Sequence, residues 1–286
     1  AWDIGPNTQF NLYGQYTTTR ETLDEGIPAP EIADLPRSRF FGERFSQFEQ
    51  DQYLIGYTLN HDFNENLKLR HALQYLSYSP VRYGPLFDFF DEETNELNRF
   101  EYFAGGNYQR FFSNAELVGK FATGPVKHQV LFGVEYRNDN ETPEFQFSNS
   151  FAPINIFNPI YTNTPYPIAP EFFRDDQINR FAVYLQDQMD LLDNLKLLAG
   201  FRYDTATQNR STRSIADVSG EFNEPRKFNQ SDDRITPRVG IVYQPIPTVS
   251  LYGSYTTSFN PTFAARLNPD GSTFDPETGR QFEVGV

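Results

Sequence analysis

The stretch that decides the fold is residues 128–137, which read His-Gln-Val-Leu-Phe-Gly-Val-Glu-Tyr-Arg. Apolar side chains recur at every second position from Val130 to Tyr136, and the charged residues Glu135 and Arg137 lie on the alternate positions. Successive side chains of a β-strand point to opposite faces of a sheet. This period of two therefore predicts a strand with one face on an apolar medium and the other on a polar one.

The same alternation recurs along the whole chain. It predicts ten strands, over residues 8–19, 50–63, 67–82, 99–124, 127–138, 177–190, 195–209, 232–244, 248–259 and 280–286. Most reach the roughly 9–11 residues that a membrane-spanning strand needs. The stretch 99–124 is long enough to continue beyond the outer leaflet.

The connections between these strands alternate between short and long. Short turns are expected at 64–66, 124–125, 192–194 and 245–247. Long loops rich in Pro, Asn, Asp, Glu and Thr are expected at 20–49, 84–98, 139–176, 211–230 and 261–278. Loops this long count against a compact soluble domain. They suit an outer-membrane β-barrel, whose short turns face the periplasm and whose long loops face outward.

The composition agrees with an all-β membrane protein. Aromatic residues make up 16% of the 286 residues, with 29 Phe and 17 Tyr, and they favour strands and membrane interfaces. Several strands end in an aromatic residue, as the girdles of a barrel would require: Phe63, Tyr136, Tyr203, Tyr243 and Tyr255. The alternative interpretation places these side chains in the core of a soluble β-sandwich.

Other features of the composition exclude whole classes of protein. No apolar run approaches the roughly 18 residues of a membrane-spanning helix. A net charge of −14 argues against nucleic-acid binding, and it disfavours a highly anionic ligand. Without cysteine there is no disulfide, Fe–S cluster or zinc ribbon.

Several segments together resemble the barrel of TonB-dependent siderophore receptors, most closely the ferrichrome or hydroxamate branch. They occur in order and cover nearly the whole chain: Asp51–Tyr57, Asn60–Phe63, Phe121–Gly124, Leu131–Tyr136, Val183–Gln188, Leu198–Asp204, Thr236–Gly240, Leu251–Tyr255, Ser258–Pro261 and Gly279–Val286. No single motif among them is strong, and the specificity comes from their order on the expected strands.

The resemblance implies a transmembrane antiparallel β-barrel of 22 strands in the bacterial outer membrane, plugged by an N-terminal domain. It further implies that a ferric siderophore binds between the plug and the upper barrel wall. A TonB box contacts TonB, which acts with ExbB and ExbD. Iron is carried as the siderophore complex, so no resident cofactor is expected.

The whole chain, residues 1–286, is interpreted as a partial barrel within a longer protein. It begins at Ala1 without a secretory signal and stops at Val286 inside an expected strand. The plug, the TonB box and the later strands are absent from it. About ten strands cannot close the expected barrel, and they leave two open edges that lipid cannot satisfy.

Candidate ligand contacts are aromatic and arginine side chains at upper strand ends and in loops. Aromatic faces supply contact area at low entropic cost, and arginine supplies directional donors to the oxygens of a chelate. The candidates are Arg82, Tyr83, Phe87, Phe145, Phe147, Phe157 and Tyr161. Phe40 and Phe41 are weaker candidates of the same kind. The alternative is that these aromatic residues pack loops against each other.

Metal binding and catalysis find little support in the sequence. The acidic runs 91–93, 175–176 and 232–233 suit Ca²⁺ chemically, but solvated loop charge is the simpler interpretation. His61, His71 and His128 lack metal-ligand spacing. No nucleophile–base motif or phosphate loop is present, so no catalytic or metal residue is assigned and an enzyme is not expected.

The sequence leaves three functions open. The first is TonB-dependent import of a ferric siderophore. The second is import of another substrate, such as a cobalamin, a glycan or another metal chelate, through the same architecture. The third is a passive porin or a soluble β-rich binding module. Long projecting strands and large loops favour a gated receptor over a porin.

Overall fold

The computed structural model describes residues 2–27, 35–148, 150–214, 222–261, 268–270 and 272–286. These form twelve strands: β1 (Trp2–Gly5), β2 (Thr8–Glu21), β3 (Gln47–Asn64), β4 (Leu67–Asp91), β5 (Glu96–Thr123), β6 (Val126–Phe147), β7 (Phe151–Asn155), β8 (Ala169–Leu192), β9 (Leu195–Ser214), β10 (Arg226–Ile246), β11 (Val249–Asn260) and β12 (Glu277–Gly285). All ten expected strands are present. The short strands β1 and β7 were not predicted. In the part of the chain that the structure describes, no helix is long and apolar enough to cross a membrane.

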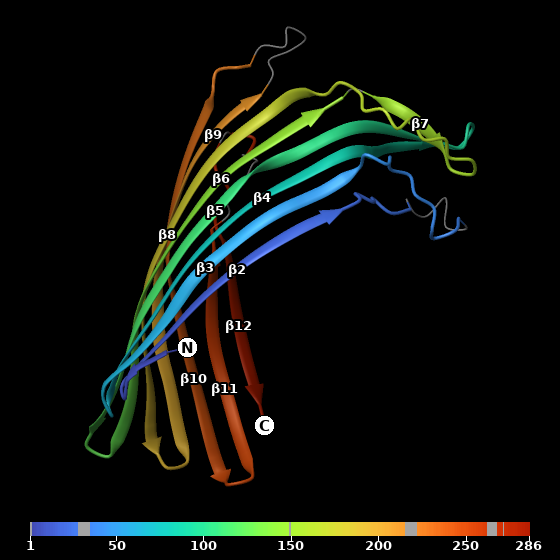
Figure 1. The fold of residues 1–286 in the computed structure, drawn as a ribbon. Coiled ribbons are helices and arrows are strands. Elements are labelled where there is room, and N and C mark those ends of the chain that lie inside the picture. Colours follow the sequence, from blue (N-terminus) through green and yellow to red (C-terminus); the bar gives the residue numbers. More distant parts are fainter. Residues whose placement is uncertain (1, 28–34, 149, 215–221, 262–267, 271) are drawn as a thin grey trace.

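The strands form one antiparallel sheet in which neighbours in sequence are neighbours in space. The order is β1-β2-β3-β4-β5-β6-β8-β9-β10-β11-β12, and β7 pairs with β5 beyond the upper end of β6. The sheet curves into a trough whose edge strands do not meet, with tight turns gathered at one end and longer connections at the other (Figure 1). The all-β, antiparallel and unclosed architecture confirms the predicted fold class.

The tight turns lie close to where the sequence predicts them. Residues 65–66, 124–125 and 193–194 join paired strands directly. Gly124 adopts a φ of +62°, the left-handed conformation that costs glycine little. The prediction at 245–247 is displaced, because β10 continues to Ile246 and the turn is formed by 247–248.

Two of the segments that the sequence predicts as long loops form strands over most of their length. β4 and β5 stay paired up to Asp91 and Glu96, so the loop 84–98 shrinks to 92–95. Asp91 Oδ1 accepts from the backbone N–H of Glu93 at 2.9 Å, and Asn95 takes a left-handed φ of 57°, which makes this acidic run a tight turn. The loop 139–176 likewise becomes the upper halves of β6 and β8, with β7 between them. Residues 28–34, 149, 215–221, 262–267 and 271 of the other predicted loops lie outside the described residues.

The register gives the sheet an outer face that is apolar and exposed. Leu117, Phe132, Leu185 and Phe201 lie directly opposite one another on β5, β6, β8 and β9. They are 38–47% exposed. Exposure of so many large apolar side chains in register fits contact with lipid rather than with water. Tyr136, Tyr203 and Tyr243 are exposed on the same face at two levels: Tyr203 pairs with Ile235, whereas Tyr243 lies eight residues further along β10 and pairs with Leu195.

The inner face carries the polar partners of the same alternation. Asp139, Asp176 and Gln208 are buried there by their neighbours, at 0–2% exposure. At the level of these three residues the inner face is therefore polar, in contrast to the apolar outer face at the level of Phe132.

Above the expected membrane level, a small core covers the outer face of β4 and β5. Its buried members are Phe41, Leu97, Ile154 and Ile156, with Ile27, Leu35, Phe87, Phe90 and Tyr161 packed against them. We call these nine residues the loop cluster. Segments 22–27, 35–46 and 151–168 supply most of it, so they act as a cover that lets the strands continue above the membrane.

Candidate functional site

The seven candidate contacts separate onto two faces of the sheet. Arg82, Phe145 and Phe147 have the inner-face register, because Arg82 pairs with Ala104, which pairs with Phe145. Tyr83, Phe87 and Tyr161 belong to the other side, in or beside the loop cluster. Phe157 lies in the segment after β7 and is 61% exposed. The structure therefore does not bring the seven together, and their role as ligand contacts stays a prediction.

The outer-face candidates have structural partners. The Tyr83 ring lies 5.7 Å from that of Phe45, and burial raises the pKa of the Tyr83 hydroxyl. The Phe87 ring meets Phe41 edge-on at 6.3 Å. The Tyr161 hydroxyl donates to the Phe40 carbonyl oxygen at 3.0 Å. These contacts agree with the alternative in which the aromatic residues pack loops together.

A buried ion pair joins the loop cluster to β5. Arg99 Nη2 lies 3.0 Å from Glu43 Oε1, and neither side chain is exposed. Arg99 also donates to the carbonyls of Phe41 and Ala152, both at 2.9 Å. The Glu43 carboxylate accepts from the backbone N–H groups of residues 162 and 163 at 3.2 and 2.9 Å. A buried pair is tolerated only when its other hydrogen bonds are satisfied in this way.

On the inner face, five aromatic side chains form a row across β5, β6 and β8. The ring centroids of Tyr102 and Phe147 lie 5.2 Å apart, and those of Phe145 and Phe172 lie 5.7 Å apart. Tyr102 also approaches Phe145 at 6.4 Å, and Phe100 approaches Phe147 at 6.1 Å. We call Phe100, Tyr102, Phe145, Phe147 and Phe172 the aromatic row. It presents a continuous apolar wall near the upper end of the inner face.

Arg82 stands beside the aromatic row but is already engaged. Its guanidinium forms an ion pair with Glu25, in the segment that follows β2. Its side chain remains 42% exposed. A ligand that accepts hydrogen bonds from Arg82 would therefore either share the guanidinium with Glu25 or displace the Glu25 carboxylate from it.

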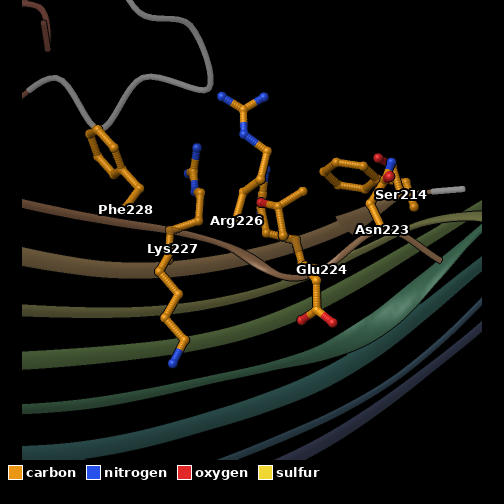
Figure 2. Close-up of a pocket in the computed structure, with 10 residues that line it drawn as sticks. Ser214, Asn223, Glu224, Arg226, Lys227 and Phe228 are labelled. Carbon is orange, nitrogen blue, oxygen red and sulfur yellow. The ribbon is translucent and has the colours of Figure 1, made fainter. Parts of the chain in front are cut away.

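A pocket of about 910 Å³ adjoins the aromatic row across β8, β9 and β10. Its lining combines aromatic and cationic side chains: Phe172, Arg174, Arg210, Thr212, Ser214, Asn223, Glu224, Arg226, Lys227 and Phe228. Arg226 and Phe228 extend to one side of β10, whereas Lys227 and the Glu224 carboxylate extend to the other (Figure 2). Phe172 belongs to both the row and the pocket, so the two are one continuous surface.

Two aspartates on the inner face are each held by two arginines. Arg174 Nε lies 2.7 Å from Asp176 Oδ2, and Arg210 Nε donates to Asp176 Oδ1 at 2.6 Å. Asp139 accepts from Arg110 Nε at 2.5 Å and from Arg137 Nε at 2.7 Å. We call these the upper and lower triads. Each carries one more positive than negative charge, and the upper triad lines the pocket.

Glu141 lies between the triads. Arg174 Nη2 approaches it at 3.7 Å. Burial raises the pKa of the Glu141 side chain above its usual range. Arg174, the second-largest influence, opposes the shift, and the carboxylates of Asp176 and Asp139 add to it.

The sequence analysis missed most of this surface. Phe172, Arg174 and Arg226 were not singled out because residues 139–176 and 211–230 were assigned to loops. Tyr102 lies inside the predicted strand 99–124 and Arg210 directly after the predicted strand 195–209, and neither was considered as a ligand contact. The signal was present as a period of two in Phe172, Arg174 and Asp176. Asp176 is 1% exposed within the upper triad, so the interpretation of run 175–176 as solvated charge is wrong for that residue.

The histidines have ordinary hydrogen-bond partners. His61 contacts Thr8, His71 contacts Ser113, and His128 lies 2.6 Å from Asp187. Among the described residues, no group of three or more His, Asp or Glu is placed to hold a metal ion.

Comparison with known proteins identifies the family. The model of the TonB-dependent receptor-like β-barrel matches residues 1–286. The metal-pseudopaline receptor CntO of Pseudomonas aeruginosa is 29% identical over 298 aligned residues, which cover 100% of this chain and 40% of the relative. The ferrichrome outer membrane transporter/phage receptor of Escherichia coli is 28% identical over 100% of this chain and 41% of its own length.

Solved structures agree in fold. The siderophore receptor PiuA of Acinetobacter baumannii superimposes with a TM-score of 0.81 at 20% identity, over 98% of this chain and 45% of that one. The ferric-catecholate import receptor Fiu of Escherichia coli gives 0.84 at 17% identity, over 99% and 46%. The chain spans about two fifths of the length of the curated relatives it matches. It belongs to the TonB-dependent receptor-like β-barrel family of outer-membrane transport receptors.

Proposed function

We propose that the protein containing this chain imports a ferric siderophore across the outer membrane, using energy passed from TonB by way of ExbB and ExbD. The observation that carries the proposal is the aromatic row beside the cationic pocket, at the end of the inner face where the longer connections gather. An apolar wall with a few convergent donors suits a rounded chelate that has an oxygen-rich rim.

The named relatives support this function. One is described as a ferrichrome transporter, another as a ferrioxamine B receptor of Salmonella typhimurium that is 26% identical over 85% of this chain. The metal-pseudopaline receptor favours a second candidate, in which the cargo is a chelate of another metal. Both candidates use the same wall and the same energy source, and they differ in the cargo alone.

The test is uptake of ⁵⁵Fe-labelled siderophores by cells that carry the full-length receptor, with and without functional TonB. The expected result is accumulation of at least one chelate only when TonB is functional. Equal uptake in both strains would indicate a passive pore. If no ferric chelate is taken up while a Ni²⁺ or Zn²⁺ chelate is, the second candidate replaces the first.

A further inference from the structure

The inner wall near the pocket has the opposite charge balance to the chain as a whole. Six arginines face inward on β5 to β10, between the level of the paired residues Arg137 and Arg180 and the upper end of β10. They are Arg110, Arg137, Arg174, Arg180, Arg210 and Arg226. Four carboxylates share these rows, namely Asp139, Glu141, Asp176 and Asp232. Six positive against four negative groups on these strands leaves +2. Lys227 and Glu224 of the pocket cancel each other, and Asp275 beside Asp232 reduces the excess to +1, in a chain whose net charge is −14.

Arg174 is the triad member with donor capacity beside the pocket. It shares Asp176 with a second arginine, and a guanidinium has five N–H donors. Arg226 has no ion pair with a described residue, although it borders the same pocket. A concave wall of one sign focuses the field and attracts ligands of the opposite sign.

From this geometry we propose that the receptor selects a ferric chelate of net negative charge, whose carboxylate or catecholate oxygens accept hydrogen bonds from Arg174, Arg210 and Arg226. The aromatic row holds the apolar part of the same ligand. The inference rests on the proposed siderophore-import function, and it replaces the expectation from overall charge that an anionic cargo is disfavoured. A neutral hydroxamate complex gains nothing from the excess charge.

The position of the upper triad in the sheet indicates that its partner is a small ligand and not a neighbouring protein domain. Asp176 lies five residues above Phe181 on β8, beyond the exposed aromatic level of the outer face. The upper triad also opens into a pocket of small-molecule size. An acidic surface of the expected plug is the competing partner, and the experiment separates the two.

The experiment measures binding to the purified full-length receptor by calorimetry. The probes are ferric citrate (a polycarboxylate), ferric enterobactin (a tris-catecholate) and ferrichrome (a neutral trihydroxamate). We expect at least one anionic probe to bind more tightly than ferrichrome, with affinity that falls as salt is added. Comparison of ferric citrate with ferric enterobactin distinguishes recognition of carboxylate oxygens from recognition of catecholate oxygens.

A matched pair of variants tests the pocket itself. Arg226→Gln removes an inward cation without breaking an ion pair with a described residue, and should weaken the anionic complex about ten-fold, the order expected for a hydrogen bond to a charged group. Arg213→Gln removes the same charge on the outer face of β9, where the guanidinium lies 5.9 Å from the Phe173 ring and does not line the pocket, and should change affinity less than two-fold. Amounts of both variants in the outer membrane control for folding.

Three results would overturn the inference while leaving the import function intact. The first is TonB-dependent uptake of ferrichrome alone, with affinity unaffected by Arg226→Gln. The second is equal weakening by both variants, which would reflect overall charge rather than the pocket. The third is unchanged ligand binding by the Arg226→Gln variant together with faster proteolysis of its plug domain. That result would mean that the arginines contact the plug and not the ligand. Absence of TonB-dependent uptake of any chelate would instead reject the proposed function.

Discussion

At the scale of single residues, the face of the sheet decides what an aromatic side chain does. Tyr102 and Tyr83 lie at nearly the same height on neighbouring strands, yet Tyr102 joins the inner aromatic row and Tyr83 packs on Phe45 on the other side. Residue type is the same for both, and only the face of the sheet differs. Their expected contributions to ligand binding are therefore different.

This contrast gives the first prediction. Tyr102→Ala should weaken ferric-chelate binding to the full-length receptor by about ten-fold, because loss of an aromatic contact costs on the order of 1–2 kcal/mol. Tyr83→Ala should change affinity less than about three-fold. Calorimetric titration of the two variants measures both effects. A larger loss for Tyr83→Ala would return the binding site to the outer-face residues.

The buried ion pair gives a second prediction at this scale. Glu43→Gln should leave the Arg99 charge unpaired and weaken the loop cluster by about 3–5 kcal/mol. Hydrogen exchange at residues 36–46 and 156–163 should accelerate accordingly. Glu49→Gln is the control, since its exposed pair with Arg20 at 3.4 Å contributes at most about 1 kcal/mol. Unchanged exchange in the Glu43 variant would contradict the assigned role.

At the scale of strands, one glycine on β6 leaves room for a large side chain of β8 on the inner face of the sheet. A Cβ added at Gly133 would lie 2.1 Å from the ring of Tyr184, which is directly opposite on β8. The Tyr184 hydroxyl lies 3.0 Å from Asn114 Oδ1 and 2.8 Å from Glu116 Oε1, and it can donate its one hydrogen to either. Gly133 thus leaves room for a tyrosine that links three strands.

We expect Gly133→Ala to displace Tyr184 and destabilise the folded receptor by about 1–3 kcal/mol, the usual cost of overpacking. Unfolding by urea in lipid vesicles measures the change. Gly119→Ala is the matched control, because a Cβ there meets nothing within 4 Å. Equal stability of the two variants would show that Tyr184 can move without cost.

At the scale of the whole molecule, the sheet formed by this chain has two open edges. Among the residues that the structure describes, β1 pairs with β2 alone and β12 with β11 alone. In lipid, each unpaired backbone group costs several kcal/mol, so a spanning sheet must close. Residues 1–286 expressed alone should therefore fail to form a monomer that resists SDS without boiling, whereas the full-length receptor should form one. A resistant monomer of the isolated segment would mean that the edges find another way to close.

The sequence by itself determined the class of fold and the order of the strands. Both follow from local signals, since an alternation such as that in residues 128–137 needs only neighbours in the chain, and turns such as Gly124 have their own chemistry. The family resemblance rested on the same strands. It agrees with the match of the family model over residues 1–286.

Only the tertiary structure decided where the strands end and which side chains meet. Residues such as Pro85 and Asp176 are typical of loops, but pairing with neighbouring strands and the cover of the loop cluster keep them in the sheet. The two triads join residues from different strands, up to 36 positions apart in the case of Arg174 and Arg210. Such pairings depend on register across the sheet, which is non-local, so the pocket and its charge could not be deduced from the order of residues alone.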